Sequence, residues 1–129
     1  MKTNLPLLGL LALALSTLVA LSGCASVPVV IATDLDSAAL VQRAQEAADA
    51  SKYEVAMQYY QALVDRYGAD PANRIAGQYE IAFLEYKMGK TAKAKELFEA
   101  VLAAYGGPGA EAFPPRYKIL AEKLLAKLK

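Results

Sequence analysis

The feature that most restricts the fold is a similarity of the chain to itself. When the sequence is shifted by 38 residues, KYEVAMQYYQALVDRYG, beginning at Lys52, aligns with KTAKAKELFEAVLAAYG, beginning at Lys90. Small, aromatic and aliphatic residues recur at helical spacing: Ala56 with Ala94, Tyr60 with Phe98, Leu63 with Val101, and Tyr67 with Tyr105. Such a pattern is typical of two helical units that pack in the same way. The sequence therefore predicts an all-α domain with an internal repeat.

These positions resemble the tetratricopeptide repeat, a helix-turn-helix unit of about 34 residues that stacks into a right-handed α-solenoid. Its second helix carries a small residue followed by an aromatic four positions later, as at Ala56 with Tyr60 and Ala94 with Phe98. Its first helix carries a large apolar residue before a small one, as at Ile81-Ala82, with Ala44 at the small position of the first unit. The resemblance covers about residues 37–107 and implies two helical hairpins.

The chain also departs from the family pattern. Residues of this chain differ from the family at four kinds of position. Gln78 and Leu40 stand where the family has tryptophan, Glu85 and Ala47 where it has tyrosine, Gly68 and Gly106 where it has proline, and Arg43 where it has leucine. The 38-residue spacing implies four extra residues, which we place in the loop YGADPANR. Lengthened repeats of this kind resemble those of outer-membrane lipoproteins that support envelope assembly. A generic antiparallel helical bundle is the alternative, and it is all-α too.

Capping residues and helix breakers set the predicted boundaries. Asp36 or Ser37 can cap the first helix, and Asp70 before Pro71 is a strong N-terminal signal. Gly89 stands where a left-handed residue would end the third helix. The five predicted helices span residues 37–50, 53–67, 71–88, 91–105 and 115–128.

The last predicted helix has an apolar stripe opposite a lysine-rich face. The stripe consists of Tyr117, Leu120, Ala121, Leu124 and Leu128. A repeat array needs an end unit that covers its last apolar face, so this helix is predicted to be a C-terminal capping helix. An amphipathic helix on a membrane surface is the alternative.

The first 23 residues have the features of a secretory signal peptide. Lys2 precedes an uncharged apolar run from Leu5 to Leu21, about 25 Å long as a helix and shorter than the ~30 Å bilayer core. The run ends in LSGC, which resembles the lipobox of bacterial lipoproteins. That resemblance implies cleavage between Gly23 and Cys24 and acylation of Cys24, the only cysteine. An uncleaved N-terminal anchor is the alternative.

The predicted organisation has three parts: a signal peptide at residues 1–23, a lipidated tether at 24–36, and a helical domain at 37–129. Pro28 and several β-branched residues disfavour a helix in the tether, whose apolar middle either packs on the domain or lies at the membrane surface. Because no aspartate follows the cysteine, the sorting pattern of lipoproteins implies the outer membrane, with the leaflet left open.

Composition excludes several function classes. Residues 24–129 hold 13 basic and 13 acidic residues, which gives no basic surplus for nucleic acid. The chain has no histidine to activate a nucleophile, and its single cysteine excludes an internal disulfide. The GGPG stretch at 106–109 lacks the strand and lysine of a phosphate-binding loop. We therefore expect no enzyme, no metal and no cofactor.

The family resemblance implies a groove lined by the first helix of each repeat. Its positions are Tyr79, Phe83, Tyr86 and Lys87 in the second unit, and Val41, Gln45, Ala48 and Asp49 in the first. The three aromatic residues form one helical stripe, which either binds a partner or belongs to the core. Two repeats make a shallow groove, so oligomerisation or a larger complex would supply more contact area.

We therefore predict a membrane-anchored lipoprotein that serves as a protein-protein interaction adaptor or scaffold in the bacterial cell envelope. The membrane contact is the lipid on Cys24, and the partner is another envelope protein or a peptide. The alternative is a lipoprotein that binds a small ligand or assists transport.

Overall fold

The computed structural model describes residues 27–128. The predicted signal peptide, the cleavage position at Gly23 and the lipid attachment at Cys24 lie outside the described residues. Within them the chain is helical and has no strand, which confirms the all-α prediction. The elements are α1 (Ser37–Asp49), α2 (Tyr53–Tyr67), α3 (Pro71–Lys87), α4 (Thr91–Ala104), a 3-10 turn η1 (Ala110–Ala112) and α5 (Pro115–Lys127). Every predicted helix end is within one residue of the observed end.

The turns between α1 and α2 and between α3 and α4 have the same geometry. Ser51 and Gly89, which are 38 residues apart, both adopt left-handed backbone conformations, with φ of 58° and 75°. The next residues, Lys52 and Lys90, return their backbone N–H groups to the carbonyls of Ala47 and Glu85 at 2.8 and 3.0 Å. The internal similarity of the sequence is thus expressed in the turns as well as in the helices. Gly89 adopts this conformation without the steric cost of a Cβ atom. Ser51 bears that cost, and among residues 27–128 it is the only non-glycine residue with a positive φ.

The N-terminal caps follow the sequence signals. The Asp36 carboxylate accepts a hydrogen bond from Ala39 N at 2.7 Å, and the Asp70 carboxylate accepts from Ala72 N at 2.7 Å. Both therefore satisfy backbone donors that an α-helix leaves without an internal partner.

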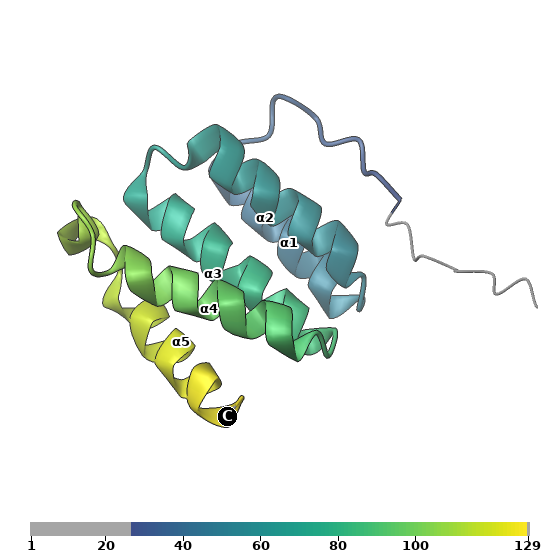
Figure 1. Ribbon diagram of the computed structural model, residues 1–129. Coiled ribbons are helices and arrows are strands. Elements are labelled where there is room, and N and C mark those ends of the chain that lie inside the picture. The colour runs from purple at the N-terminus through teal and green to yellow at the C-terminus, as the bar shows by residue number, and fades with distance from the viewer. Residues whose placement is uncertain (1–26, 129) are drawn as a thin grey trace, which may run out of the picture.

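Consecutive helices pack against one another in chain order, and α3 also contacts α5. Figure 1 shows the helices side by side, with α5 at one side of the stack. The buried residues form two clusters, one mainly between α1 and α2 and the other among α3, α4 and α5. Equivalent repeat positions are buried alike. Ala56 and Ala94 are both fully buried, and Leu63 and Val101 are at most 1% exposed.

Gly77 allows α3 to approach α2 closely. A Cβ at this position would lie 2.5 Å from Val64 Cγ2 and 3.2 Å from the Tyr60 carbonyl oxygen. The contact with the backbone oxygen cannot be relieved by moving a side chain, so a larger residue here would push the two hairpins apart.

The C-terminal helix covers the end of the second cluster. Tyr117 and Ala121 are buried against α3 and α4, and Phe113 packs edge-on against Tyr105, with ring centroids 5.4 Å apart. The Tyr105 hydroxyl donates to the Pro114 carbonyl at 2.6 Å and fixes the start of the helix. Leu120, which belongs to the predicted apolar stripe, is 40% exposed and is not part of this cluster.

Residues 27–36 precede α1 in an irregular conformation and lie along α2. Ile31 and Leu35 pack on the first apolar cluster. Of the two predictions for the apolar middle of the tether, packing on the domain is therefore observed for this part of it.

Candidate binding groove

Two adjoining hollows form one groove between α1, α3 and α5. They have volumes of about 410 and 430 Å³ and share Gln45, Tyr60 and Glu80 in their walls. The first reaches along α1 and α3 toward Ser51 and Lys87, and the second extends to Arg116 on α5. We call this feature the α1–α3–α5 groove. Its size is in the range of sites that hold a side chain or a short peptide segment.

Six of the eight positions predicted to line the groove do so. They are Val41, Gln45, Ala48 and Asp49 on α1, and Phe83 and Lys87 on α3. Gln45 and Lys87 are exposed, whereas Val41 and Phe83 are half-buried. The arrangement therefore combines apolar surface with polar groups that can orient a bound segment.

The prediction for Tyr79 as an exposed groove residue is wrong. Its side chain is only 6% exposed, and its ring lies 5.8 Å from that of Phe98 and 5.3 Å from that of Tyr117, between centroids. The physical reason is that α4 and α5 together cover the side of α3 on which it stands. Tyr79 therefore belongs to the core, the alternative that its helical spacing left open.

Tyr86 lies at the edge of the same aromatic group and is absent from the groove lining. It is half-buried and packs on Phe83, with ring centroids 6.1 Å apart. The aromatic stripe is thus divided: Tyr79 is core, Phe83 lines the groove, and Tyr86 supports Phe83 from the side.

Sequence reasoning missed the most distinctive group in the groove, the Glu80 carboxylate. Glu80 is half-buried beside the buried ring of Tyr60, which comes from α2. The signal that could have found it is its place on α3, four residues before the buried Leu84 and one turn before the groove residue Phe83. A charged residue flanked by such neighbours is more enclosed than one on a solvated face.

The α5 contribution to the groove was also missed. Arg116 places its guanidinium 4.6 Å from the Tyr117 ring centroid and donates to the Tyr117 hydroxyl at 2.6 Å. This contact holds Arg116 on its own helix, and the ion pairs of residues 27–128 do not include one to Glu80. The groove therefore contains an acid that is partly enclosed and has no bound counter-charge.

The titration behaviour of the groove reflects this enclosure. Burial raises the pKa of Glu80 above its ordinary value, and the positive charge of Arg116 partly opposes the rise. Burial, together with the Glu80 charge, raises the pKa of Tyr79 to about 12. The pKa of Tyr60 is raised further by the same two causes. Both phenols therefore stay protonated at neutral pH and can act as hydrogen-bond donors.

A third hollow, of about 360 Å³, lies on α2, α3 and α4. It has no ionisable side chain, and its walls are Gln61, Val64, Gln78, Ile81, Leu97, Ala100, Val101 and Ala104. We call it the α2–α3–α4 hollow. Its apolar lining is suited to shape-selective contact more than to recognition of charge.

In the described part of the chain, no three histidine, cysteine, aspartate or glutamate side chains come together in a way that could hold a metal ion. No helix among residues 27–128 combines the length and apolar character needed to cross a membrane.

No family model, curated protein or solved structure matches the chain. Inferences about function therefore rest on the chemistry of the described residues.

Proposed function

We propose that the chain is a lipid-anchored adaptor whose helical domain binds a segment of another envelope protein in the α1–α3–α5 groove. The observation that carries the proposal is the juxtaposition of the Glu80 carboxylate, which has no ion-pair partner among residues 27–128, with apolar surface from Val41 and Phe83 in an open groove. Such a groove recognises a peptide through one apolar anchor and one oriented polar contact.

The charge of Glu80 specifies the chemistry of the partner. A lysine or arginine of the partner would offset the cost of keeping this carboxylate partly desolvated, and the Tyr60 hydroxyl beside it adds a neutral donor. We therefore expect the bound segment to carry a basic side chain next to an apolar one. An acidic segment would be rejected by like charge.

The architecture that we propose is a pair of tetratricopeptide-like hairpins followed by a capping helix. Support comes from the equivalent turns at Ser51 and Gly89, from the matched burial of Ala56 and Ala94, and from the place of the groove on the first helix of each hairpin. In this arrangement α1, α3 and α5 are successive groove-lining helices.

A charge reversal tests the groove. The protein is cross-linked to its partner in native membranes and then purified, and the amount of partner recovered is measured. The full-length Glu80→Lys variant should recover at least about tenfold less partner than the wild type, since the partner's basic group would be repelled. Glu99→Lys is the matched control, because it makes the same charge change on the exposed side of α4. Equal recovery of the partner by both variants, with unchanged helical circular dichroism, would exclude the groove as the binding site.

The anchor is a proposal that follows from the LSGC motif. We propose cleavage after Gly23, acylation of Cys24 and residence in the envelope, with the outer membrane favoured by the residues after the cysteine. The full-length Cys24→Ser variant should accumulate as an uncleaved, unacylated precursor in intact-mass analysis. Normal processing of that variant would refute the proposed anchor.

The α2–α3–α4 hollow supports a second candidate function, binding of a small apolar ligand. Its volume of about 360 Å³ and its uncharged walls fit a compact ligand. Native mass spectrometry of the protein released from membranes distinguishes the two functions. A bound small molecule that is lost in the Ala100→Phe variant would favour the ligand-binding function, whereas retention of partner binding in the same variant would favour the adaptor.

A further inference from the structure

The segment before α1 exposes two large apolar side chains to solvent. Val27 is 78% exposed and Val30 is 97% exposed, although both belong to a stretch, residues 27–33, that has no charged side chain. Neighbouring apolar residues in the same segment behave differently, because Ile31 and Leu35 pack on the α1–α2 cluster. The segment therefore has an inner side that meets the domain and an outer side that is apolar and uncovered.

Side chains of α2 hold this segment in place at both ends. The Gln58 amide accepts from Val29 N at 2.7 Å and donates to the Val27 carbonyl at 3.1 Å, so it pairs with the backbone as a neighbouring strand would. Farther along, Arg66 donates to the carbonyls of Ala32 and Ile31 at 2.7 and 3.2 Å. The path of the segment over α2 is consequently fixed, and with it the direction in which Val30 points.

The docked segment begins close to the proposed lipid. Only three residue steps separate Cys24 from Val27, a span of at most about 10 Å in an extended chain. A freely hanging tether of thirteen residues would reach about 45 Å by the same measure. Because the segment is docked as far as Val27, most of that reach is already used along the surface of the domain.

We propose that the docked segment seats the domain directly on the bilayer, with Val27 and Val30 inserted into the interfacial region of the lipid. The inference rests on the acylation of Cys24 in the proposed function, and it adds a second contact with the membrane. An extended apolar strip beside an acylated residue is suited to this role, since one lipid signal combined with a second apolar contact gives stable attachment. The α1–α3–α5 groove is then presented to partners in one orientation relative to the membrane.

Lipid quenching of a fluorescent label tests the proposal on the full-length, membrane-processed protein. A thiol-reactive environment-sensitive dye is attached to the Val30→Cys variant and, as the control, to the Ala112→Cys variant. Ala112 is exposed and belongs to η1, which lies at the opposite end of the molecule from the start of the described chain in Figure 1. An acylated Cys24 is a thioether and does not take the dye, so each variant carries one label.

Both labelled proteins are reconstituted in vesicles of phosphatidylethanolamine and phosphatidylglycerol that contain a nitroxide-labelled lipid. We expect the label at position 30 to be quenched severalfold more strongly than the label at position 112. Equal quenching at both positions, in protein whose acylation is verified by intact mass, would overturn the seating of the domain and leave the anchor in place. Absence of acylation in the mass spectrum would overturn the anchor and the inference with it.

A second copy of the chain is the other surface that could cover these valines. The unlabelled Val30→Cys variant in the same vesicles is therefore treated with a mild thiol oxidant. If it forms an intermolecular disulfide while the labelled variant is not quenched by lipid, the outer side of the segment is a dimer contact and the proposal is wrong.

Discussion

The two ends of the helical stack are closed in different ways. At the N-terminal end an extended segment lies on α2 and is held by side chains that reach its backbone, Gln58 and Arg66 above all. At the C-terminal end α5 contributes the buried residues Tyr117 and Ala121 to an apolar cluster. The first closure is mainly polar and the second mainly apolar.

The difference follows from what each kind of backbone requires. A helix satisfies most of its own N–H and C=O groups, so α5 needs only an apolar face to pack. An extended segment has no internal partners, and its carbonyls must find donors on the surface that it crosses. Tyr67, for example, donates to the Leu35 carbonyl at 2.8 Å. We therefore expect the C-terminal closure to dominate stability and the N-terminal closure to be detachable.

The largest effect is expected from Tyr117→Ala. The change removes a ring that is 7% exposed and packed 5.3 Å from Tyr79, between centroids, and should lower the free energy of unfolding by about 3 kcal/mol. Urea unfolding followed by circular dichroism measures it. Ile119→Ala on the same helix is the control, because Ile119 is 50% exposed and its loss should cost less than about 0.5 kcal/mol. Similar losses for both variants would contradict an apolar closure by α5.

A smaller effect is expected from Arg66→Ala at the other end. The variant loses two hydrogen bonds to the carbonyls of Ile31 and Ala32, which should lower the free energy of unfolding by about 1 kcal/mol. Its distinctive result is local: amide hydrogen exchange should accelerate in residues 29–35 and remain slow in α3 and α4.

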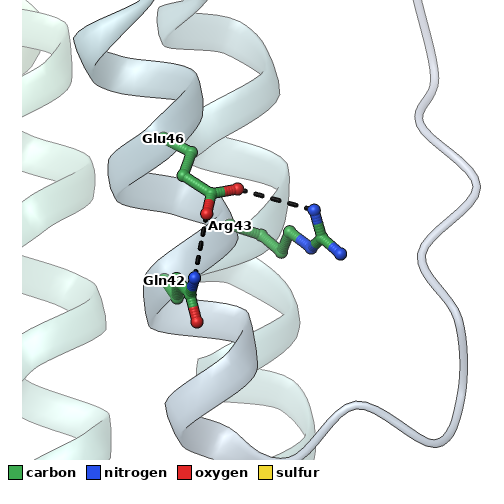
Figure 2. Close-up of polar contacts among 3 residues, drawn as sticks. All are labelled: Gln42, Arg43 and Glu46. Carbon is green, nitrogen blue, oxygen red and sulfur yellow. Dashed lines mark hydrogen bonds and ion pairs between the residues drawn. The ribbon is translucent and has the colours of Figure 1, made fainter.

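The control for this prediction is Arg43→Ala. Arg43 is also an exposed arginine, but its partner Glu46 lies one turn away on α1, at 3.5 Å, and Gln42 donates to the same carboxylate (Figure 2). Removal of this local contact should change stability by less than about 0.5 kcal/mol and leave exchange in residues 29–35 unchanged. If amide exchange in residues 29–35 also accelerated in Arg43→Ala, the hydrogen bonds from Arg66 would not be what holds this segment on α2.

The helices could be predicted from the sequence because their signals are local. Asp36 and Asp70 cap the helices they were expected to cap, and Gly89 ends α3 in the left-handed conformation. Each of these outcomes depends on a few neighbouring residues and on general backbone chemistry. The internal repeat then gave the order in which helices pack, since equivalent residues meet equivalent neighbours.

The candidate site could be predicted only in part, because it depends on contacts between distant segments. Helical spacing placed Tyr79 and Phe83 on one stripe. Tyr79 is the one that is buried, because Phe98 of α4 and Tyr117 of α5 pack on it. Glu80 was missed for a related reason: its place on α3 is only a weak signal, because its enclosure also depends on Tyr60 of α2 and on residues of α1 and α5 that are distant in the sequence. The docking of residues 27–35 likewise depends on Gln58 and Arg66, about thirty residues away.

The smallest effect on stability is expected from a change at Glu80, which lines the groove beside Arg116 of α5. Burial raises the pKa of Glu80 in the folded protein above its pKa in the unfolded chain. The contribution of Glu80 to stability is therefore greatest below the unfolded-state pKa, and it is lost as the pH rises through the folded-state pKa and the carboxylate becomes charged. Glu80→Gln should therefore be more stable than the wild type at neutral pH, by less than the loss expected for Arg66→Ala. That advantage should shrink as the pH falls, when urea unfolding is measured between pH 4 and pH 8.

Arg116 on α5 opposes this rise, so its removal reports whether α5 acts on the groove electrostatically as well as closing the stack. In Arg116→Ala the pKa of Glu80 should rise further, which carboxyl-carbon NMR titration of the folded protein measures directly. Lys118→Ala is the matched control, because it removes a positive charge only two residues farther along α5, at an exposed position outside the groove lining. If both variants move the pKa equally, the effect is one of overall charge, and α5 contributes to the groove by packing alone.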